Sequence, residues 1–336
     1  MSASAPAIPA PPERIAPPRE STKSWPLVDR FAYLLCWLVG IGLCLIAVAI
    51  VVYMFLKGVA YLKPEMLLTP PAPSQNQAQS GGFSSAIVGT FVVTGIGILI
   101  AAPVGVGIAA WLTEYRRPAA LARAVESAIE MLAGAPSVVL AIFGLATFSR
   151  GFLTFLSREA AEPGEALGQS FLVAGIVMSA IALPLVVTST REGLLQLPPR
   201  VREASLALGK TRSTTIRSVL LPSIRPSVAS GVVLGMGRII GDTAIITILL
   251  GSALHNEPVN STPLIGLLRG TGSTLTSYVY SNSPAGEGNS HEKAYAAAFV
   301  LLAIVLVLNA TVTRLTGASA TGTPIRRRRW RLPWTR

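Results

Sequence analysis

The chain has 336 residues, of which 51% are hydrophobic and 13% charged, whereas soluble domains carry about 25% charged residues. This composition excludes an ordinary cytosolic enzyme. The net charge of +12 is compatible with binding to a nucleic acid, an anionic membrane surface or an acidic partner. The positions of the charges along the chain distinguish these three possibilities. The first 30 residues are rich in Pro and Ala and predict a disordered tail. No signal peptide is recognised before the first long apolar run.

Six apolar runs follow in chain order, and a helix needs about 20 apolar residues to cross the bilayer core. They cover Phe31–Phe55, Ala86–Leu112, Met131–Phe148, Phe171–Thr188, Ser230–Leu254 and Ala294–Val312. Soluble cores do not contain six such runs. The sequence therefore predicts an all-α polytopic membrane protein with six transmembrane helices. Cys36 and Cys44 are expected to be small buried hydrophobic residues, and no metal site is expected because His255 and His291 lie far from both.

The positive charges alternate between the loops. Most of the 28 Lys and Arg precede the first run, separate the second from the third and the fourth from the fifth, or occupy the C-terminal tail. Since cytoplasmic loops carry this excess, both termini are predicted in the cytoplasm. The run Arg326–Arg331 is interpreted as an anchor on anionic membrane lipid, and nucleic acid is not expected as a partner.

These patterns predict four regions. They are a disordered cytoplasmic tail (1–30), a first transmembrane helix with an outer linker (31–85), a core of five transmembrane helices (86–316) and a basic cytoplasmic tail (317–336).

The core includes a basic loop, residues 199–222, with the pattern of two short helices. Pro199 can begin the first helix and Gly209 can end it in a left-handed conformation. The second is predicted over Ser213–Leu220, with Pro222 ending it.

Three functions compete for this loop. Ala204-x4-Gly209-Lys210-Thr211 matches a relaxed phosphate-binding loop, but no buried strand precedes it and Ala204 replaces the first glycine. A DNA-binding helix–turn–helix would suit the size and charge, but the flanking spans hold the loop at the membrane. A docking element for a cytoplasmic partner is the favoured interpretation.

The loop resembles a known family at this point. Its residues Glu203-Ala204-Ser205-x3-Gly209-x9-Val219-x-Leu221-Pro222 are similar to the EAA loop of ABC-importer permeases of the type I, MetI-like fold. The resemblance implies that Glu203, Ala204, Gly209, Leu221 and Pro222 couple the chain to an ATPase subunit. It also implies that ATP and Mg are bound by that ATPase, so that this chain has no cofactor and no catalytic residue of its own.

Further stretches resemble the phosphate-specific permeases, and the PstA type in particular. They are Ala86–Thr90, Leu112–Tyr115, Glu130–Val139, Ser189–Leu194 and Gly235–Ala244. One departure is Gly241-Asp-Thr-Ala-Ile245, where the family usually has Gly-Glu-Thr-Ala-Pro. The resemblance implies a phosphate importer of the bacterial inner membrane. Its other parts would be a PstC-type permease or a second copy of this chain, a PstB-type ATPase dimer and a PstS-type phosphate-binding protein.

The fifth run contains the candidate substrate pathway. A charged residue at the centre of a membrane helix costs about 2.5–3.5 kcal/mol, and Arg238 and Asp242 are spaced to pair on one helical face. Arg238, Asp242, Thr243 and Ser137 are the predicted pathway residues, because arginine offers a fork of donors to phosphate. Alternatively, the charged pair only fixes packing. Arg191 is interpreted as an interface charge rather than a second phosphate contact.

Small residues in the same run predict close helix packing, at Gly231-x3-Gly235. Other functional classes remain as alternatives. The PstC-type sister subunit and a permease for sulfate, molybdate or an organic solute are the nearest alternatives. A membrane scaffold without transport would tolerate changes at Glu203 and Gly209. An intramembrane enzyme lacks candidate residues.

Overall fold

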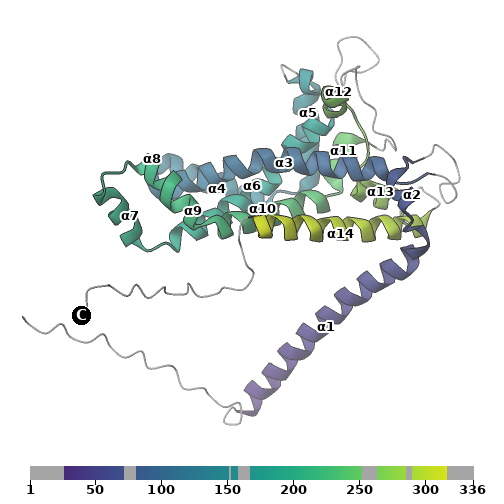
Figure 1. The fold of residues 1–336 in the computed structure, drawn as a ribbon, viewed down its shortest axis with the longest axis horizontal. Helices are drawn as coiled ribbons and strands as arrows, with labels where there is room; N and C mark the ends of the chain where they lie inside the picture. Colours follow the sequence, from purple (N-terminus) through teal and green to yellow (C-terminus); the bar gives the residue numbers. More distant parts are fainter. Residues whose placement is uncertain are drawn as a thin grey trace, which may run out of the picture. The chain divides into compact units, whose positions relative to one another are not determined.

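The computed structural model describes residues 26–71, 81–150, 153–157, 167–251, 263–284 and 290–315. Within these ranges the regular elements are all helices (Figure 1). The predicted basic tail, most of the N-terminal tail and residues 72–80 of the outer linker lie outside the described residues. The first helix begins at Leu27, so residues 27–30 are helical and the predicted boundary of the tail at residue 30 is corrected.

The chain divides into two units, Met1–Tyr53 and Met54–Arg336. The first unit contains most of α1 (Leu27–Gly58). In the second unit the helices are, in order, α2 (Pro64–Leu68), α3 (Ser84–Ala110), α4 (Ala119–Gly134), α5 (Ser137–Ser149), α6 (Phe171–Leu195), α7 (Pro199–Ala207), α8 (Arg212–Thr215), α9 (Leu221–Ser223), α10 (Arg225–Gly241), α11 (Ala244–Leu250), α12 (Pro263–Arg269), α13 (Leu275–Asn282) and α14 (His291–Leu315). A π-helical turn, Trp111–Tyr115, extends α3, and a second one, Ile216–Leu220, joins α8 to α9. Short 3-10 turns lie at Val59–Tyr61 and Thr154–Leu156.

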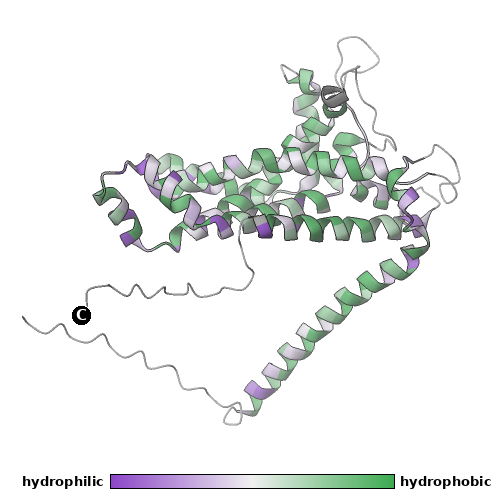
Figure 2. Ribbon diagram, viewed as in Figure 1, coloured by the Kyte–Doolittle hydropathy of each residue, from purple (hydrophilic) through white to green (hydrophobic). Residues whose placement is uncertain are grey.

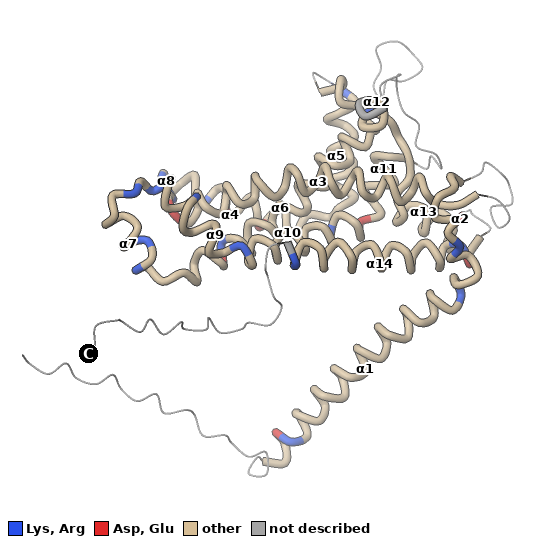
Figure 3. Tube along the Cα trace, viewed as in Figure 1, with Lys and Arg blue, Asp and Glu red and all other residues tan. Residues whose placement is uncertain are grey.

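Among the described residues, four helical stretches are long and apolar enough to cross a membrane: Leu27–Tyr61, Ser84–Tyr115, Phe171–Leu195 and His291–Arg314. Two bent helix pairs raise the number to six if each pair is one span. They are α4 with α5, bent by 109°, and the segment Arg212–Ser223 with α10, bent by 73°. Figure 2 shows hydrophobic residues along the long helices, and Figure 3 shows Lys and Arg gathered where α7 and α8 lie.

Two of the predicted runs are not continuous helices. The run Met131–Phe148 breaks at Ala135 and Pro136, which are both extended, because a residue before proline is kept out of the helical region. The run Ser230–Leu254 breaks after Gly241, where Asp242 is extended. Glycine is a weak helix former, and aspartate competes for backbone N–H groups near a break.

The centre of the second unit is α6. In an apolar stretch of 18 residues of this helix, 67% of the residues are buried. Glycines let its neighbours approach the same turn: a Cβ added at Gly105 of α3 would lie 2.8 Å from Val186 Cγ1, and one at Gly231 of α10 would lie 3.0 Å from Val186 Cα. A Cβ added at Gly235 would lie 3.2 Å from Ala182 Cβ. The close approach predicted at Gly231 and Gly235 is therefore confirmed.

Polar contacts hold the N-terminal parts of α3 and α14 in place. The Leu275 N–H at the start of α13 donates to Thr90 Oγ1 of α3 at 2.9 Å. Lys293, in the first turn of α14, is fully buried and donates from Nζ to the Gly81 carbonyl at 3.0 Å. This bond anchors the end of the predicted outer linker, because a buried ammonium group needs a polar partner.

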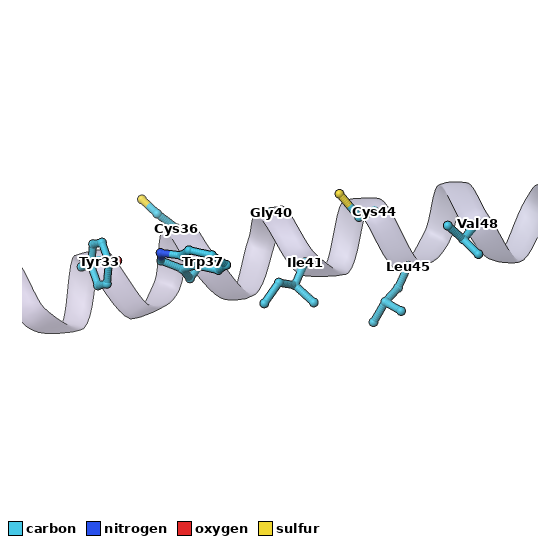
Figure 4. Close-up of a pocket in the computed structure, with 8 residues that line it drawn as sticks. All are labelled: Tyr33, Cys36, Trp37, Gly40, Ile41, Cys44, Leu45 and Val48. Atoms are coloured by element: carbon cyan, nitrogen blue, oxygen red, sulfur yellow. The ribbon is translucent and has the colours of Figure 1, made fainter. Parts of the chain in front are cut away.

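The part of α1 in the first unit exposes its apolar side chains. Figure 4 shows one face of it, formed by Tyr33, Cys36, Trp37, Gly40, Ile41, Cys44, Leu45 and Val48. Cys36 and Cys44 are free and exposed, with both sulfur atoms on the same side of the helix, so the prediction that they are buried is wrong. A helix in lipid needs no protein cover for its apolar residues, since lipid tails are as apolar as leucine.

Candidate functional site

The first arm of the basic loop is α7, which begins at Pro199 as predicted. Its end is a Schellman motif, in which the Gly209 N–H donates to the Leu206 carbonyl at 2.9 Å and the Lys210 N–H to the Ser205 carbonyl at 3.3 Å. Gly209 has φ +76°, so the predicted left-handed conformation is confirmed. These bonds satisfy the carbonyl groups at the end of α7 and turn the chain back towards α8.

The second arm begins at Thr211, whose side chain accepts a hydrogen bond from the Thr214 N–H at 3.3 Å. The helical conformation then continues through the π-helical turn and α9 to Ser223. The prediction that Pro222 ends this helix is therefore wrong. Pro222 lies in the first turn of α9, where a missing N–H is tolerated. The buried hydroxyl groups of Ser205 and Thr215 are 2.9 Å apart and hold the two arms together.

The outer surface of the two arms is open. Glu203, Ala204, Gly209 and Pro222 are exposed, and Leu221 is half-buried. A shallow groove of about 420 Å³ separates the arms, lined by Arg200, Val201, Ala204, Ser205, Leu208, Lys210 and Val219. An apolar surface that includes Leu208, which is 81% exposed, and is flanked by two cations, suits a protein partner with apolar and acidic side chains.

Arg202 joins α7 to the C-terminal ends of α3 and α6. Its Nε donates to Glu114 Oε1 at 2.8 Å, and its Nη1 and Nη2 donate to the Leu197 and Leu194 carbonyls at 3.2 and 2.8 Å. Glu114 belongs to the π-helical turn after α3, and Leu194 to the last turn of α6. Arg202 is not among the residues predicted from the sequence. Two features of the sequence could have pointed to this ion pair: Arg202 is next to Glu203 of the loop, and Glu114 lies at the cytoplasmic end predicted for the second apolar run.

A second ion pair lies beside the first. Arg191 of α6 donates from Nη2 to Glu126 Oε1 of α4 at 2.7 Å, and Arg116 Nη2 lies 3.8 Å from the same oxygen. A cavity of about 280 Å³ adjoins the pair and is also lined by Glu130 and Glu192. Arg191 thus serves as a charge between helices, which agrees with its interpretation from sequence.

The four predicted pathway residues lie at two helix breaks. Arg238 is exposed in the last turn of α10, where a cation interacts favourably with the helix dipole. Thr243 is half-buried just before α11, and Ser137 is half-buried at the first position of α5. No hydrogen bond or ion pair joins any two of these three residues and Asp242, all of which are described.

Asp242 has a different contact from the one predicted. The expectation that it pairs with Arg238 on one helical face is wrong, because α10 ends at Gly241 and Asp242 is extended. Its Oδ1 instead accepts a hydrogen bond from the Ile245 N–H at 3.0 Å and so caps α11. Nearby, the Thr276 hydroxyl donates to the Ile240 carbonyl at 2.7 Å, which satisfies a carbonyl group at the end of α10.

The described residues contain no group of three His, Cys, Asp or Glu side chains that could hold a metal ion. The long apolar helices, the two breaks and the exposed two-armed loop are the features of a multi-pass membrane protein. A family model described as "Binding-protein-dependent transport system inner membrane component" matches residues 101–322. The match covers more than half of the chain, and the chain belongs to this family.

Several relatives are phosphate transport proteins by name. The phosphate transport system permease protein PstC 1 of Mycobacterium bovis is 34% identical over 188 residues, which cover 52% of this chain and 55% of the relative. PstC of Xylella fastidiosa (strain 9a5c) is 31% identical over 239 residues, which cover 68% of this chain and 69% of the relative. The chain thus spans about half the length of the mycobacterial protein.

The fold is shared with a solved importer. The structure of a bacterial alginate ABC transporter, bound to a periplasmic protein that carries an alginate pentasaccharide, matches 86% of this chain and 94% of that chain, with a TM-score of 0.60 at 16% identity. This likeness shows the fold alone. Together with the family match it confirms the predicted all-α fold of an ABC-importer permease. The chain is a transport component and not itself an enzyme.

Proposed function

We propose that this chain is a permease subunit of an ATP-driven importer of inorganic phosphate and forms half of its transmembrane pore. The observation that carries the proposal is the identity of 34% and 31% to the phosphate transport permeases of Mycobacterium bovis and Xylella fastidiosa, within a family of importer components. The exposed two-armed loop supports the ATP-driven part, because it offers an apolar and basic surface to a partner.

The partners follow from the energetics of anion uptake. Bringing an anion into a cell that is negative inside costs about 2.3 kcal/mol per charge for each 100 mV, so uptake needs an energy source. A PstB-type ATPase dimer, which binds ATP and Mg, would dock on residues 199–222 through Glu203, Ala204, Gly209, Leu221 and Pro222. A PstS-type protein would deliver phosphate from outside. The alternating positive charges support an orientation with both termini in the cytoplasm.

The type of subunit has two candidates. Ser189–Leu194 and Thr113–Tyr115 resemble the PstA type, whereas the relatives from Mycobacterium and Xylella are named PstC. A PstA-type chain pairs with a PstC-type chain in the pore, and the reverse holds for a PstC-type chain. Co-purification with each sister chain distinguishes the two types, and capture of an untagged copy by a tagged one would reveal a homodimer.

The pathway is proposed to pass the breaks that hold Arg238, Asp242, Thr243 and Ser137. The exposed guanidinium of Arg238 can donate two parallel hydrogen bonds to a phosphate. Thr243 and Ser137 add uncharged hydroxyl donors at the breaks. The Asp242 carboxylate supports the pathway indirectly, because it caps α11 and so holds the break in shape.

Uptake of radiolabelled phosphate by cells that carry Arg238→Gln tests the function and the pathway together. We expect uptake to fall about tenfold or more, because a hydrogen bond to a charged group contributes about 1.5–3 kcal/mol. The matched control is Arg225→Gln, which removes an exposed arginine from the first turn of the same helix. Membrane abundance and co-purification of the ATPase are measured in the same cells.

The outcomes separate the alternatives. Normal uptake by the Arg238→Gln variant, with assembly intact, would remove Arg238 from the pathway. Loss of phosphate uptake on deletion of this chain supports the phosphate assignment. If deletion abolishes the uptake of sulfate, molybdate or an organic solute and leaves phosphate uptake intact, the chain belongs to a different importer.

A further inference from the structure

The arginine at the base of α7 touches three structural elements at once. Arg202 belongs to the loop that docks the ATPase under the proposed function, while its three bonds end on Glu114 beyond α3, on Leu194 in α6 and on Leu197 in the connection to α7. The side chain of Arg202 is 25% exposed and that of Glu114 is 14% exposed. Water therefore screens this pair less than it screens an exposed surface pair.

The geometry is specific to arginine. A guanidinium is planar and carries five N–H donors in a fixed fork, so one side chain can bond a carboxylate and two carbonyl groups in fixed directions. The two carbonyls lie at and just beyond the end of α6, where backbone acceptors have no partner within the helix and the dipole favours a cation. A lysine in this position would keep the charge but not the fork.

Apolar packing also joins these elements, but in a less directed way. Ala110 of α3, Leu194 of α6, Ile216 and Leu220 of the second arm, and Ile224 just before α10 form one buried cluster. Hydrophobic contact is not directional, so such a cluster holds the elements together while allowing them to slide. The chain itself connects α7 directly to α6 and to α8, but not to α3. The bond from Arg202 to Glu114 is a directed contact between α7 and the end of α3.

We propose that Arg202 is the positioning residue that transmits movement of the docked loop to α3 and α6 together. When the ATPases close, α7 moves with them, and the three bonds of Arg202 oblige both helix ends to follow. The same movement reaches α4 through the pair between Arg191 and Glu126. Arg202 touches neither phosphate nor ATP in this scheme, and it acts through Glu114.

The test uses the whole importer, reconstituted in vesicles with its ATPase and binding protein. Phosphate uptake and ATP hydrolysis are measured in the same vesicles for Arg202→Gln, Arg202→Lys and Glu114→Gln. We expect the phosphate moved per ATP hydrolysed to fall about five- to tenfold for Arg202→Gln and Glu114→Gln, while the ATPase stays bound and hydrolyses ATP. Arg202→Lys should retain an intermediate ratio. Arg123→Gln, at an exposed position of α4, is the control.

A purely structural role predicts a different result, in which uptake and hydrolysis fall together with the amount of assembled complex. The exchange Arg202→Glu with Glu114→Arg adds a further test. It restores the link to α3 but not the bonds to the Leu194 and Leu197 carbonyls, so partial recovery of the ratio is expected. No change in the ratio for either single glutamine variant would overturn the proposal.

A distance measurement separates this proposal from the proposed function on which it rests. Spin labels are placed at Ala207→Cys in α7 and Leu195→Cys in α6, two exposed positions, after Cys36 and Cys44 have been replaced by alanine. With Arg202 present, the separation of the labels should stay the same with and without ATP. In Arg202→Gln it should change on ATP binding. This readout needs no phosphate transport, so a complex that moves another solute still tests the link.

Discussion

Close packing at the centre of the second unit depends on glycine, and Gly105→Ala tests this. The new Cβ would lie 2.8 Å from Val186 Cγ1 and 2.9 Å from Val186 Cβ, whereas ordinary carbon contacts are about 3.5–4.0 Å. Val186 is fully buried and β-branched in α6, so its side chain cannot rotate away. The helices α3 and α6 must therefore separate by several tenths of an ångström.

The cost of this separation can be isolated with a second variant. Inserting a methyl group into a packed core costs about 1–3 kcal/mol. Alanine also gains about 1 kcal/mol of helix propensity over glycine. Gly107→Ala, two residues further along α3, gains the same propensity, and nothing lies within 4 Å of its added Cβ. The difference between the two variants is therefore the packing cost alone.

The assay is thermal unfolding of the purified chain in detergent, measured side by side for both variants. A difference of about 1–3 kcal/mol corresponds to a melting temperature roughly 2–12 °C lower for Gly105→Ala than for Gly107→Ala, on the scale known for soluble domains of 150–250 residues. Equal melting temperatures would refute the reasoning, since they would show that α3 and α6 can separate without loss of stability.

Three further variants test local features of the structure. Arg116 has φ +45°, a left-handed conformation that costs a non-glycine residue about 1–2 kcal/mol, while its 3.8 Å contact with Glu126 is largely exposed and weak. Arg116→Gly should therefore keep or raise the melting temperature and Arg116→Val should lower it; equal values for the two would contradict this account. Asp242→Ala should lower stability by about 0.5–2 kcal/mol through loss of the cap on α11, whereas Asp242→Asn, which keeps an acceptor, should not. The Thr190 hydroxyl is buried and has no hydrogen-bond partner among the described residues, so Thr190→Val should leave the melting temperature unchanged or raise it, and a clear decrease would show that the hydroxyl has a partner in the assembled protein.

Local features of the basic loop could be predicted from sequence because their causes are local. Pro199 begins α7 and Gly209 ends it, since each residue type suits that position through its own backbone. The same rule failed at Pro222, where the π-helical turn before it lets the helical conformation continue to Ser223. A proline predicts a boundary only when its neighbours follow the regular pattern.

The candidate pathway shows the opposite case. Four-residue spacing predicted that Arg238 and Asp242 pair, but that spacing has meaning only within one continuous helix. Asp242 satisfies its carboxylate with the Ile245 N–H, and this local bond replaces the predicted ion pair. Arg202 was missed for a related reason, because its partner Glu114 is distant in the chain and only the folded structure brings them together.

The sequence by itself determined that the chain is an all-α membrane protein of six apolar runs, since apolar length and charge placement act without reference to a partner. It also determined the family, through motifs whose residues are close neighbours in the chain. Only the tertiary structure decided which helices meet at Val186, and that Arg202 joins α7 to the ends of α3 and α6. Both features join residues that are distant in the chain. They therefore depend on how the helices pack, which is decided only when those segments come together.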